Sequence, residues 1–290
     1  MSPYSIILDS PFLLTSLATV VGLLVGSFLN VVIYRLPVMI QRDWKKECQE
    51  FLKLPITEQP AEPFNLSLPH SHCPNCNTPI KIYHNIPVFS YLFLQGQCAY
   101  CAEPISSRYP FIEAFTGLLS AVVAYQLGGQ IETLFALILT WTLIALSGID
   151  YDHQLLPDNI TLPVLWLGLF LSLFNIFTDP TSSIIGAIAG YLVLWSIYQL
   201  FKLLTGKEGM GYGDFKLLAL FGAWLGWQYL PLIILLSSLA GAIIGVALII
   251  FLGRDKSIPI PFGPYLAIAG WIALLWGEQL NTLYLVNAGL

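Results

Sequence analysis

The stretch that decides the fold class is an apolar run at residues 232–252, LIILLSSLAGAIIGVALIIFL, which contains no charged side chain. A run of about 20 apolar residues is long enough to cross the hydrocarbon core of a bilayer as one helix. Similar runs lie at 11–34, 111–127, 131–149, 159–177, 184–204, 214–229 and 263–278. Only 10% of all residues are charged, whereas a soluble domain carries about 25%. The sequence therefore predicts an all-α polytopic membrane protein with about eight transmembrane helices.

The basic residues predict the orientation of these helices. All twelve Lys and Arg residues fall within residues 35–53, 81–108, 202–216 and 254–256. With eight spans and an external N-terminus, each of these segments lies on the cytoplasmic side. The opposite side then carries acidic residues but no Lys or Arg, as the positive-inside rule requires.

Pairs of glycines four residues apart occur in several of the predicted spans. Small residues at this spacing let two helices approach closely, so we expect them at helix–helix contacts. The pairs are Gly22/Gly26, Gly186/Gly190, Gly222/Gly226 and Gly241/Gly245.

The only long polar stretch follows the first apolar run. We therefore expect a first transmembrane helix within residues 1–35, a cytoplasmic loop at 36–110, and a seven-helix membrane domain at 111–290. Residues 41–54 of the loop could form an amphipathic helix that lies on the membrane surface through apolar side chains such as Trp44 and Phe51.

The second part of the loop contains two CxxC pairs, Cys73-Pro-Asn-Cys76 and Cys98-Ala-Tyr-Cys101. Two such pairs can complete the tetrahedral thiolate coordination of a structural zinc ion. We therefore predict a small ribbon-like zinc module with four cysteine ligands, the Cys module, at about residues 70–104. Disulfides are the first alternative, but they require an oxidising compartment. A redox motif is the second, but it needs only one CxxC pair.

Three histidines lie near these cysteines, and one cysteine lies apart from them. Because four sulfur ligands suffice, we expect His70, His72 and His84 to stay outside the ligand set, and Cys48 to be an isolated thiol. A module of about 40 residues has too small a core to fold unaided, so zinc would supply its folding energy.

Two acidic clusters lie at the ends of predicted helices. The third span ends in Gly-Ile-Asp150-Tyr-Asp152-His, and the sixth begins with Gly211-Tyr-Gly213-Asp214. Both ends are predicted at the cytoplasmic boundary, so the carboxylates of Asp150 and Asp214 can meet there. Two facing carboxylates share one proton, and one can then activate a water while the other protonates a scissile carbonyl oxygen. Asp150 and Asp214 are therefore the predicted catalytic pair of an aspartyl protease.

Four neighbouring residues are candidates for supporting roles. Gly211 and Gly213 would let the backbone leave regular helix and let an extended substrate approach closely. Asp152 is a helper or a solvated residue. Asp158, in Leu-Pro-Asp158, could support the site, but an N-cap of the fourth span is the simpler interpretation. Asp214 could likewise be no more than a cap of the sixth span.

Taken together, these motifs resemble the type IV prepilin peptidase family, whose members are aspartyl proteases with a GxGD signature. The resemblance rests on Gly211–Asp214, Ile149-Asp150, the following Leu-Pro-Asp158, the tandem CxxC pairs and Gly26-Ser-Phe-Leu-Asn30. It covers nearly the whole chain, as far as Pro261-Phe-Gly-Pro264. It places Asp150 and Asp214 in the catalytic positions and the four cysteines in the zinc positions.

The resemblance implies a bifunctional enzyme of the bacterial inner membrane. Such enzymes cleave a short basic leader after a glycine in prepilins and type II secretion pseudopilins. They then methylate the new N-terminal residue, usually phenylalanine, with S-adenosylmethionine. We therefore expect prepilin and pseudopilin substrates and the lipid bilayer as partners, and no nucleic acid.

The residues that hold the methyl donor are not assigned by the sequence. No G-x-G-x-x-G loop follows a predicted strand. The Cys module is the first place to look, because preflagellin peptidases, which do not methylate, resemble the same core without it. Glu113 and Asn30 are further candidates. Glu113 could instead stabilise the first turn of a helix, and Asn30 could make an interhelical hydrogen bond.

Two other classes of function are weighed against the protease. A proton-coupled transporter also uses intramembrane carboxylates, but it needs a polar lining across several helices. A zinc-bearing assembly scaffold would explain the cysteines but leaves Asp150 and Asp214 unexplained. A cleavage assay separates both from the protease.

Overall fold

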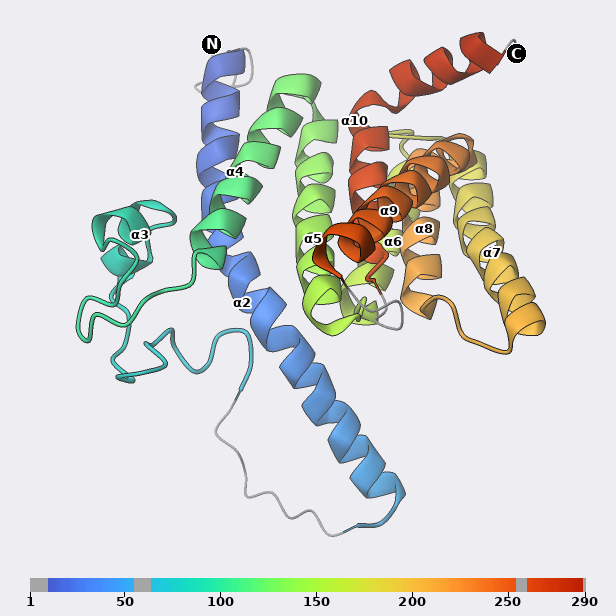
Figure 1. Ribbon diagram of the computed structural model, residues 1–290. Coiled ribbons are helices and arrows are strands. Elements are labelled where there is room, and N and C mark those ends of the chain that lie inside the picture. Colours follow the sequence, from blue (N-terminus) through green and yellow to red (C-terminus); the bar gives the residue numbers. More distant parts are fainter. Residues whose placement is uncertain (1–9, 55–63, 254–259, 289–290) are drawn as a thin grey trace. The chain divides into compact units, whose positions relative to one another are not determined.

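The computed structural model describes residues 10–54, 64–253 and 260–288, which form helices joined by turns (Figure 1). Within these ranges there is no β-strand, only isolated bridges between His72 and Pro79 and between Gln97 and Pro104. The all-α prediction is confirmed. Arg254 and Lys256, which entered the charge argument, lie outside the described residues. The chain divides between Gly129 and Gln130 into two compact units.

The first unit contains α2 (Pro11–Phe51), η1 (Ile82–Asn85), α3 (Phe89–Phe93) and α4 (Arg108–Leu127). Pro11 opens α2, and the Ser10 hydroxyl caps it by accepting a hydrogen bond from the Leu13 N–H at 3.5 Å. The helix continues past Pro37, because the Lys, Glu and Gln residues that follow are good helix formers. α2 is therefore longer than the span predicted at 11–34, and the amphipathic segment predicted at 41–54 is largely its continuation.

α2 and α4 pack closely because small residues line their contact. A Cβ on Gly26 would lie 2.8 Å from the Glu113 Cα, and a Cβ on Gly22 would overlap the Ser120 side chain. The amide of Asn30 donates hydrogen bonds to the carbonyl oxygens of Gly26 at 3.3 Å and Tyr109 at 3.2 Å. The second of these bonds joins the two helices, as the interhelical interpretation of Asn30 predicts.

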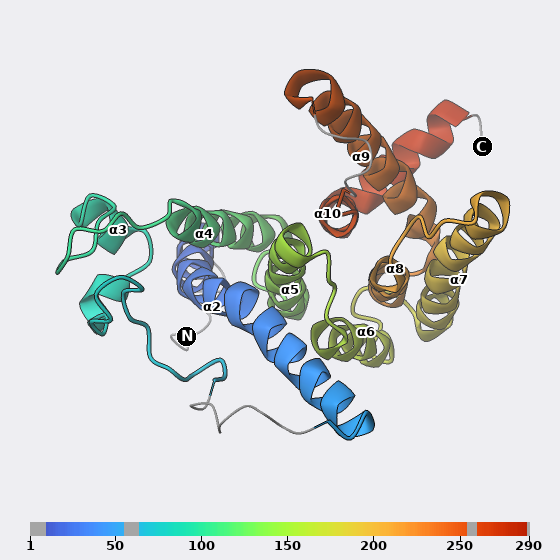
Figure 2. The same ribbon diagram turned by 60° about the horizontal axis from the view of Figure 1, so that its bottom comes forward.

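The second unit contains α5 (Ile131–His153), α6 (Asp158–Ser172), α7 (Pro180–Thr205), α8 (Tyr212–Leu225), η2 (Trp227–Tyr229), α9 (Leu230–Leu252) and α10 (Gly263–Ala288). Figure 2 shows α8 between α6 and α7, and α8 is buried over nearly all of its surface from Asp214 to Leu225. Its approach to α7 depends on glycine, because a Cβ on Gly222 would overlap the Gly186 carbonyl. On the other side, the Trp224 Nε1–H donates to the Val164 carbonyl of α6 at 2.8 Å.

The remaining glycines of the predicted pairs differ in the contacts that they make. Gly190 also lies against the α8 backbone, with a Cβ position 2.7 Å from the Leu218 oxygen. Gly226 instead ends α8 with a φ of +87°, which stops the helix before the predicted residue 229. Gly241 has only ordinary contacts, 3.5 Å or more from its Cβ position. Close packing is therefore confirmed for Gly22/Gly26, Gly186/Gly190 and Gly222/Gly226, since a Cβ on Gly186 would also lie 2.9 Å from the carbonyl carbon of Gly226, and it is wrong for Gly241.

Five helical segments among the described residues are long and apolar enough to cross a membrane, namely α2, α4, α5, α7 and Trp227–Phe251. The protein is therefore a multi-pass membrane protein. α6 and α8 have 15 and 14 residues, and at about 1.5 Å per residue they reach only about 21–23 Å of a core about 30 Å thick. Each predicted span coincides with a helix, but the count of eight transmembrane helices stays a prediction. The functional division at residues 36–110 and 111–290 also stays a prediction.

Candidate active site and metal centre

Asp150 lies in the last turn of α5 and is only 5% exposed. Its Oδ2 accepts a hydrogen bond from the backbone N–H of Gly263 at 3.0 Å, and Gly263 is the first residue of α10. A carboxylate at the C-terminus of its own helix is opposed by the helix dipole, whereas one at the N-terminus of another helix is favoured. α10 therefore offsets the unfavourable position of Asp150 on α5.

Asp214 lies in the first turn of α8 and is 8% exposed. Its backbone N–H donates to the Gly211 carbonyl at 3.3 Å. Gly211 occupies the N-cap position of α8, so Asp214 is not the residue that caps the helix. The carboxyl group is near enough to Asp150 for the charge of one to act on the other. Both acids therefore belong to one electrostatic site inside the second unit.

Leu156 joins the segments that carry the two acids. A Cβ on Gly213 would lie 2.7 Å from the Leu156 Cβ, and a Cβ on Gly263 would lie 3.2 Å from its Cδ2. Leu156 is itself buried in the core of the unit. The end of α5, the α5–α6 connection and the starts of α8 and α10 therefore meet around this one side chain.

The glycines of the GxGD motif differ in what the structure requires of them. Gly213 has no room for a Cβ because Leu156 packs against it. Gly211 has an extended backbone (φ −83°, ψ 151°), and the nearest atom to a Cβ there is the Asp214 Oδ2 at 3.9 Å. Packing therefore accounts for Gly213 but not for Gly211, where close approach of an extended substrate stays the prediction.

The remaining predicted acids lie at the edge of this site. Asp158 begins α6 and pairs with Lys216 of α8, with 2.7 Å between the Lys216 Nζ and each carboxylate oxygen. The N-cap of α6 is Pro157, so the cap interpretation of Asp158 is wrong, and its carboxylate links two helices instead. Asp152 lies on the exposed side of the last turn of α5, and its supporting role stays a prediction.

The four predicted cysteines come together in the first unit. Their sulfur atoms all lie within 4.8 Å of one another, with 3.7 Å between those of Cys73 and Cys101. Tetrahedral coordination with Zn–S bonds of about 2.3 Å places sulfur atoms about 3.8 Å apart. The cluster could therefore hold one metal ion, and its donor set is the one typical of structural zinc. None of His70, His72 or His84 joins the group that surrounds this site among the described residues.

Two similar backbone loops present these cysteines. In each loop the N–H of the first cysteine bonds the carbonyl of the residue five positions later, Thr78 at 3.1 Å and Glu103 at 2.8 Å. Asn77 and Ala102, each directly after a second cysteine, both have a positive φ, at 54° and 56°. The pattern C-x-x-C-x-x-P-I repeats 25 residues apart, at 73–80 and 98–105. The CxxC motifs predicted the ligands, and this longer repeat would also have predicted the paired loops.

Hydrogen bonds in the loops lower the pKa of two of the four thiols, whereas burial and the neighbouring thiols raise the pKa of Cys101 to about 11. Hydrogen bonds from the side chain and backbone of Thr78 lower the pKa of Cys76 to about 6. Backbone hydrogen bonds from Tyr100 and Cys101 lower the pKa of Cys98. Because the thiolate is the form that ligates a metal, both shifts favour binding at neutral pH.

Sequence reasoning missed two residues that position these sites. Gly263 holds Asp150 through its backbone, and only the motif Pro-Phe-Gly-Pro gave a sign of it. Arg35 is buried, and its guanidinium donates to the carbonyls of Asn65 at 3.0 Å and Pro69 at 2.7 Å. It therefore fixes the chain that leads into the Cys module, and a basic residue at the end of an apolar run was the available signal.

Two protein-family models match the chain, one within each of its two units. The model of the bacterial peptidase A24 N-terminal domain matches residues 20–127, and that of the type IV leader peptidase family matches residues 137–246. Full-length relatives are named prepilin leader peptidase/N-methyltransferase. The one from Stutzerimonas stutzeri is 54% identical over 100% of both chains, that from Aeromonas hydrophila 55% over 96% of both, and that from Pseudomonas aeruginosa 56% over 92% of both. No solved structure matches the chain.

Proposed function

Because the chain belongs to the type IV leader peptidase family, it is an enzyme of prepilin leader cleavage and N-methylation, and we propose that Asp150 and Asp214 catalyse the cleavage. Both residues lie within the segment that matches the peptidase model, residues 137–246. The observation that carries the proposal is that Asp150 and Asp214 are both buried and that the segments holding them, at Gly263 and Gly213, pack against the same side chain, Leu156. Burial of a carboxyl group costs free energy, so a buried acid in a membrane protein is by default a candidate for a functional role. Here two such acids belong to neighbouring segments.

In the proposed reaction the two carboxyl groups share a single proton. The ionised carboxylate takes a proton from the attacking water, while the protonated one donates to the oxygen of the scissile carbonyl. The hydrogen bond from Gly263 to Asp150 favours the charged form of that residue. On this basis Asp150 is the better candidate for the base and Asp214 for the acid, although their titration belongs to the pair.

The site lies where α5 ends and α8 and α10 begin, so the substrate bond needs to reach only the boundary of the membrane. We propose that this boundary faces the cytoplasm of a bacterial inner membrane. The hydrophobic helix of the substrate would then stay in the bilayer while its basic leader lies in the cytoplasm. Type II secretion pseudopilins, which share these features, are proposed as substrates together with prepilins.

The Cys module is proposed to hold a structural Zn²⁺. Its sulfur spacing supports tetrahedral coordination, and four thiolates leave no position open for a reacting water. S-adenosylmethionine is the proposed methyl donor, and it would supply an electrophilic methyl group for the new N-terminus.

Replacement of each acid by asparagine tests the catalytic pair. Asp150→Asn and Asp214→Asn keep the shape of the side chain but remove the shared proton and its charge. We expect each purified variant to lose cleavage of a prepilin substrate by about 10²–10⁴-fold or more. Asp158→Asn is the matched control, because it removes a carboxylate from the edge of the site, and we expect its cleavage rate to stay within a few-fold. Full cleavage by either single variant at position 150 or 214 would exclude the two-aspartate mechanism.

A further inference from the structure

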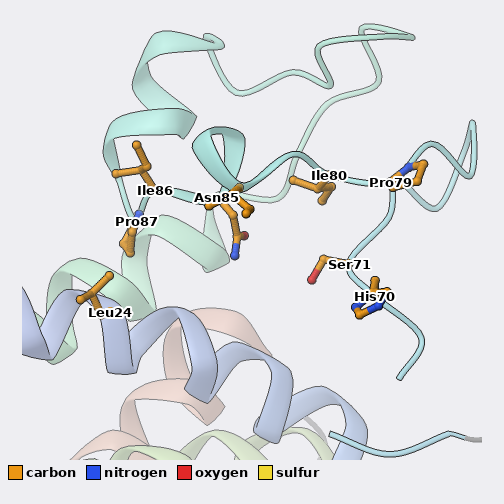
Figure 3. Close-up of a pocket in the computed structure, with 9 residues that line it drawn as sticks. Leu24, His70, Ser71, Pro79, Ile80, Asn85, Ile86 and Pro87 are labelled. Carbon is orange, nitrogen blue, oxygen red and sulfur yellow. The ribbon is translucent and has the colours of Figure 1, made fainter. Parts of the chain in front are cut away.

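A pocket of about 630 Å³ lies in the first unit between α2 and the Cys module (Figure 3). One wall is the apolar side chain of Leu24 on α2. Ile86 and Pro87, just before α3, lie on the same side of the pocket as Leu24 in Figure 3. His70 and Ser71 lie across from them, on the same side as Pro79 and Ile80, and Asn85 points into the space between the two sides in Figure 3. Pro79, Ile80 and Ile82 complete the lining, so the pocket is mostly apolar, and its three polar side chains are the groups that can orient a ligand.

A strained turn holds the wall formed by Ile86 and Pro87 in place. Val88 has φ 62° and ψ −50°, and the Phe89 N–H bonds the Pro87 carbonyl at 2.6 Å, which together form a γ-turn of the rare, strained kind. A β-branched residue rarely adopts this conformation. The Val88 N–H also donates to the buried Glu113 Oε2 of α4 at 2.7 Å. Such strain persists where neighbouring structure fixes it, and it often marks a functional site.

The surroundings of the pocket are apolar as well. Leu24 lies 11 residues before Arg35, or about 16 Å along the helix, so this wall is well inside the predicted apolar span. Ile82, Phe89 and Phe93 are 92%, 67% and 86% exposed on the adjoining η1–α3 segment. Large exposed apolar side chains of this kind, in a membrane protein, indicate contact with lipid. A ligand that is itself held in the bilayer can therefore reach the pocket.

We propose that this pocket binds the new N-terminal residue of the cleaved substrate and is the acceptor site for its methylation. The apolar side chain would lie against Leu24, Ile86 and Pro87. The α-amino group would lie among the hydrogen-bond acceptors of Asn85, Ser71 and His70. This assignment rests on the proposed function, which supplies a substrate with an apolar N-terminus at the membrane boundary.

The place of the pocket in the chain separates it from the proposed protease site, and its chemistry favours this occupant over the methyl donor. The lining comes entirely from residues 24–87, within the segment that matches the N-terminal domain model, whereas both acids of the proposed protease lie in the segment that matches the peptidase model. A charged sulfonium donor would also lose hydration against Leu24, Ile86 and Pro87, while an apolar side chain gains from the same contact.

An apolar pocket also suits the chemistry of an amine acceptor. The ammonium form must first lose a proton to solvent, and apolar surroundings favour the neutral amine. The nitrogen lone pair then forms a bond to the methyl carbon, the carbon–sulfur bond of the sulfonium donor breaks, and its electrons stay on sulfur. The products are a secondary ammonium group and a neutral thioether.

The test uses the full-length protein in nanodiscs of phosphatidylethanolamine and phosphatidylglycerol. The acceptor is a synthetic peptide that begins at the mature N-terminus, so its methylation does not depend on cleavage. Leu24→Trp reduces the space in the pocket, and Leu17→Trp is the matched control, because Leu17 lies two helical turns earlier on α2 with a similar exposure (49% against 57%) but does not line the pocket. We expect Leu24→Trp to raise the KM for the acceptor at least about tenfold. It should leave the KM for S-adenosylmethionine and the cleavage of prepilin unchanged, and Leu17→Trp should change none of them.

A second measurement needs no variant. A peptide with a photoreactive phenylalanine analogue at its first position should crosslink to Leu24, Ile86 or Pro87 in the wild-type protein. Crosslinks confined to the second unit, or an unchanged acceptor KM in a folded Leu24→Trp variant, would overturn the inference. If Leu24→Trp raised the KM for S-adenosylmethionine instead, the pocket would be assigned to the methyl donor. If bound phospholipid stayed in the pocket and the peptide did not displace it, the pocket would be assigned to lipid. Absence of prepilin cleavage by the wild-type protein would contradict the proposed function, independently of these results.

Discussion

The replacement Gly263→Ala tests whether the backbone of α10 positions Asp150, the proposed catalytic base. The added Cβ would lie 2.6 Å from the Asp150 Oδ2 and 3.1 Å from its Cγ. Real Cβ contacts essentially never fall below 3.0 Å and seldom below 3.4 Å, so the carboxylate must move by about 0.4–0.8 Å. The bound N–H of residue 263 and the packed Leu156 limit how the site can adjust. A misplacement of about 1 Å at a catalytic group can cost about 10²-fold in rate.

We therefore expect Gly263→Ala to lower kcat for prepilin cleavage by about 30–100-fold with a KM close to that of the wild type. Gly241→Ala is the matched control, because its Cβ would meet nothing closer than 3.5 Å. It should keep full activity and gain up to about 1 kcal/mol of helix stability. Rates are measured on purified protein in one detergent, with thermal unfolding of each variant. A folded Gly263→Ala variant with the wild-type kcat would refute the role assigned to Gly263.

Three further predictions concern the scaffold and the metal centre. Cys98→Ser should abolish stoichiometric zinc binding, measured by elemental analysis. It should also make residues 64–107 sensitive to limited proteolysis, because the Cys module has too small a core to fold without metal. An unchanged metal content would contradict the four-cysteine site. Lys216→Ala removes the ion pair with Asp158, which is partly exposed, so thermal unfolding should show a loss of only about 0–1 kcal/mol. Gly222→Ala forces a Cβ into the α7 backbone and should destabilise the folded protein by about 3 kcal/mol or more; an unchanged melting temperature would show that α7 and α8 are not in this contact.

The fold class and the candidate site residues could be predicted because both depend on patterns of side chains. Long apolar runs located the helices to within a few residues at most ends, and the paired CxxC motifs located the sulfur cluster. Helix ends were less predictable where the backbone decides them. α8 stops at Gly226 because of its positive φ, and α2 continues through Pro37 into a polar segment. Apolar content marked residues 214–229 as a span, but it does not show that α8 is only 14 residues long and buried among other helices.

What the sequence could not show is how the cost of each buried charge is offset. The hydrogen bond that Asp150 accepts comes from the N–H of a glycine more than 100 residues away, and Arg35 is bound by two backbone carbonyls of the loop. Backbone groups have the same chemistry at every residue, so no residue type in the sequence signals them. Side-chain patterns therefore identify which residues are candidates for the reaction, whereas the backbone that positions them follows only from the fold. For this reason the geometry of the candidate active site depends on Gly213 and Gly263, which have no side chain, as well as on the two aspartates.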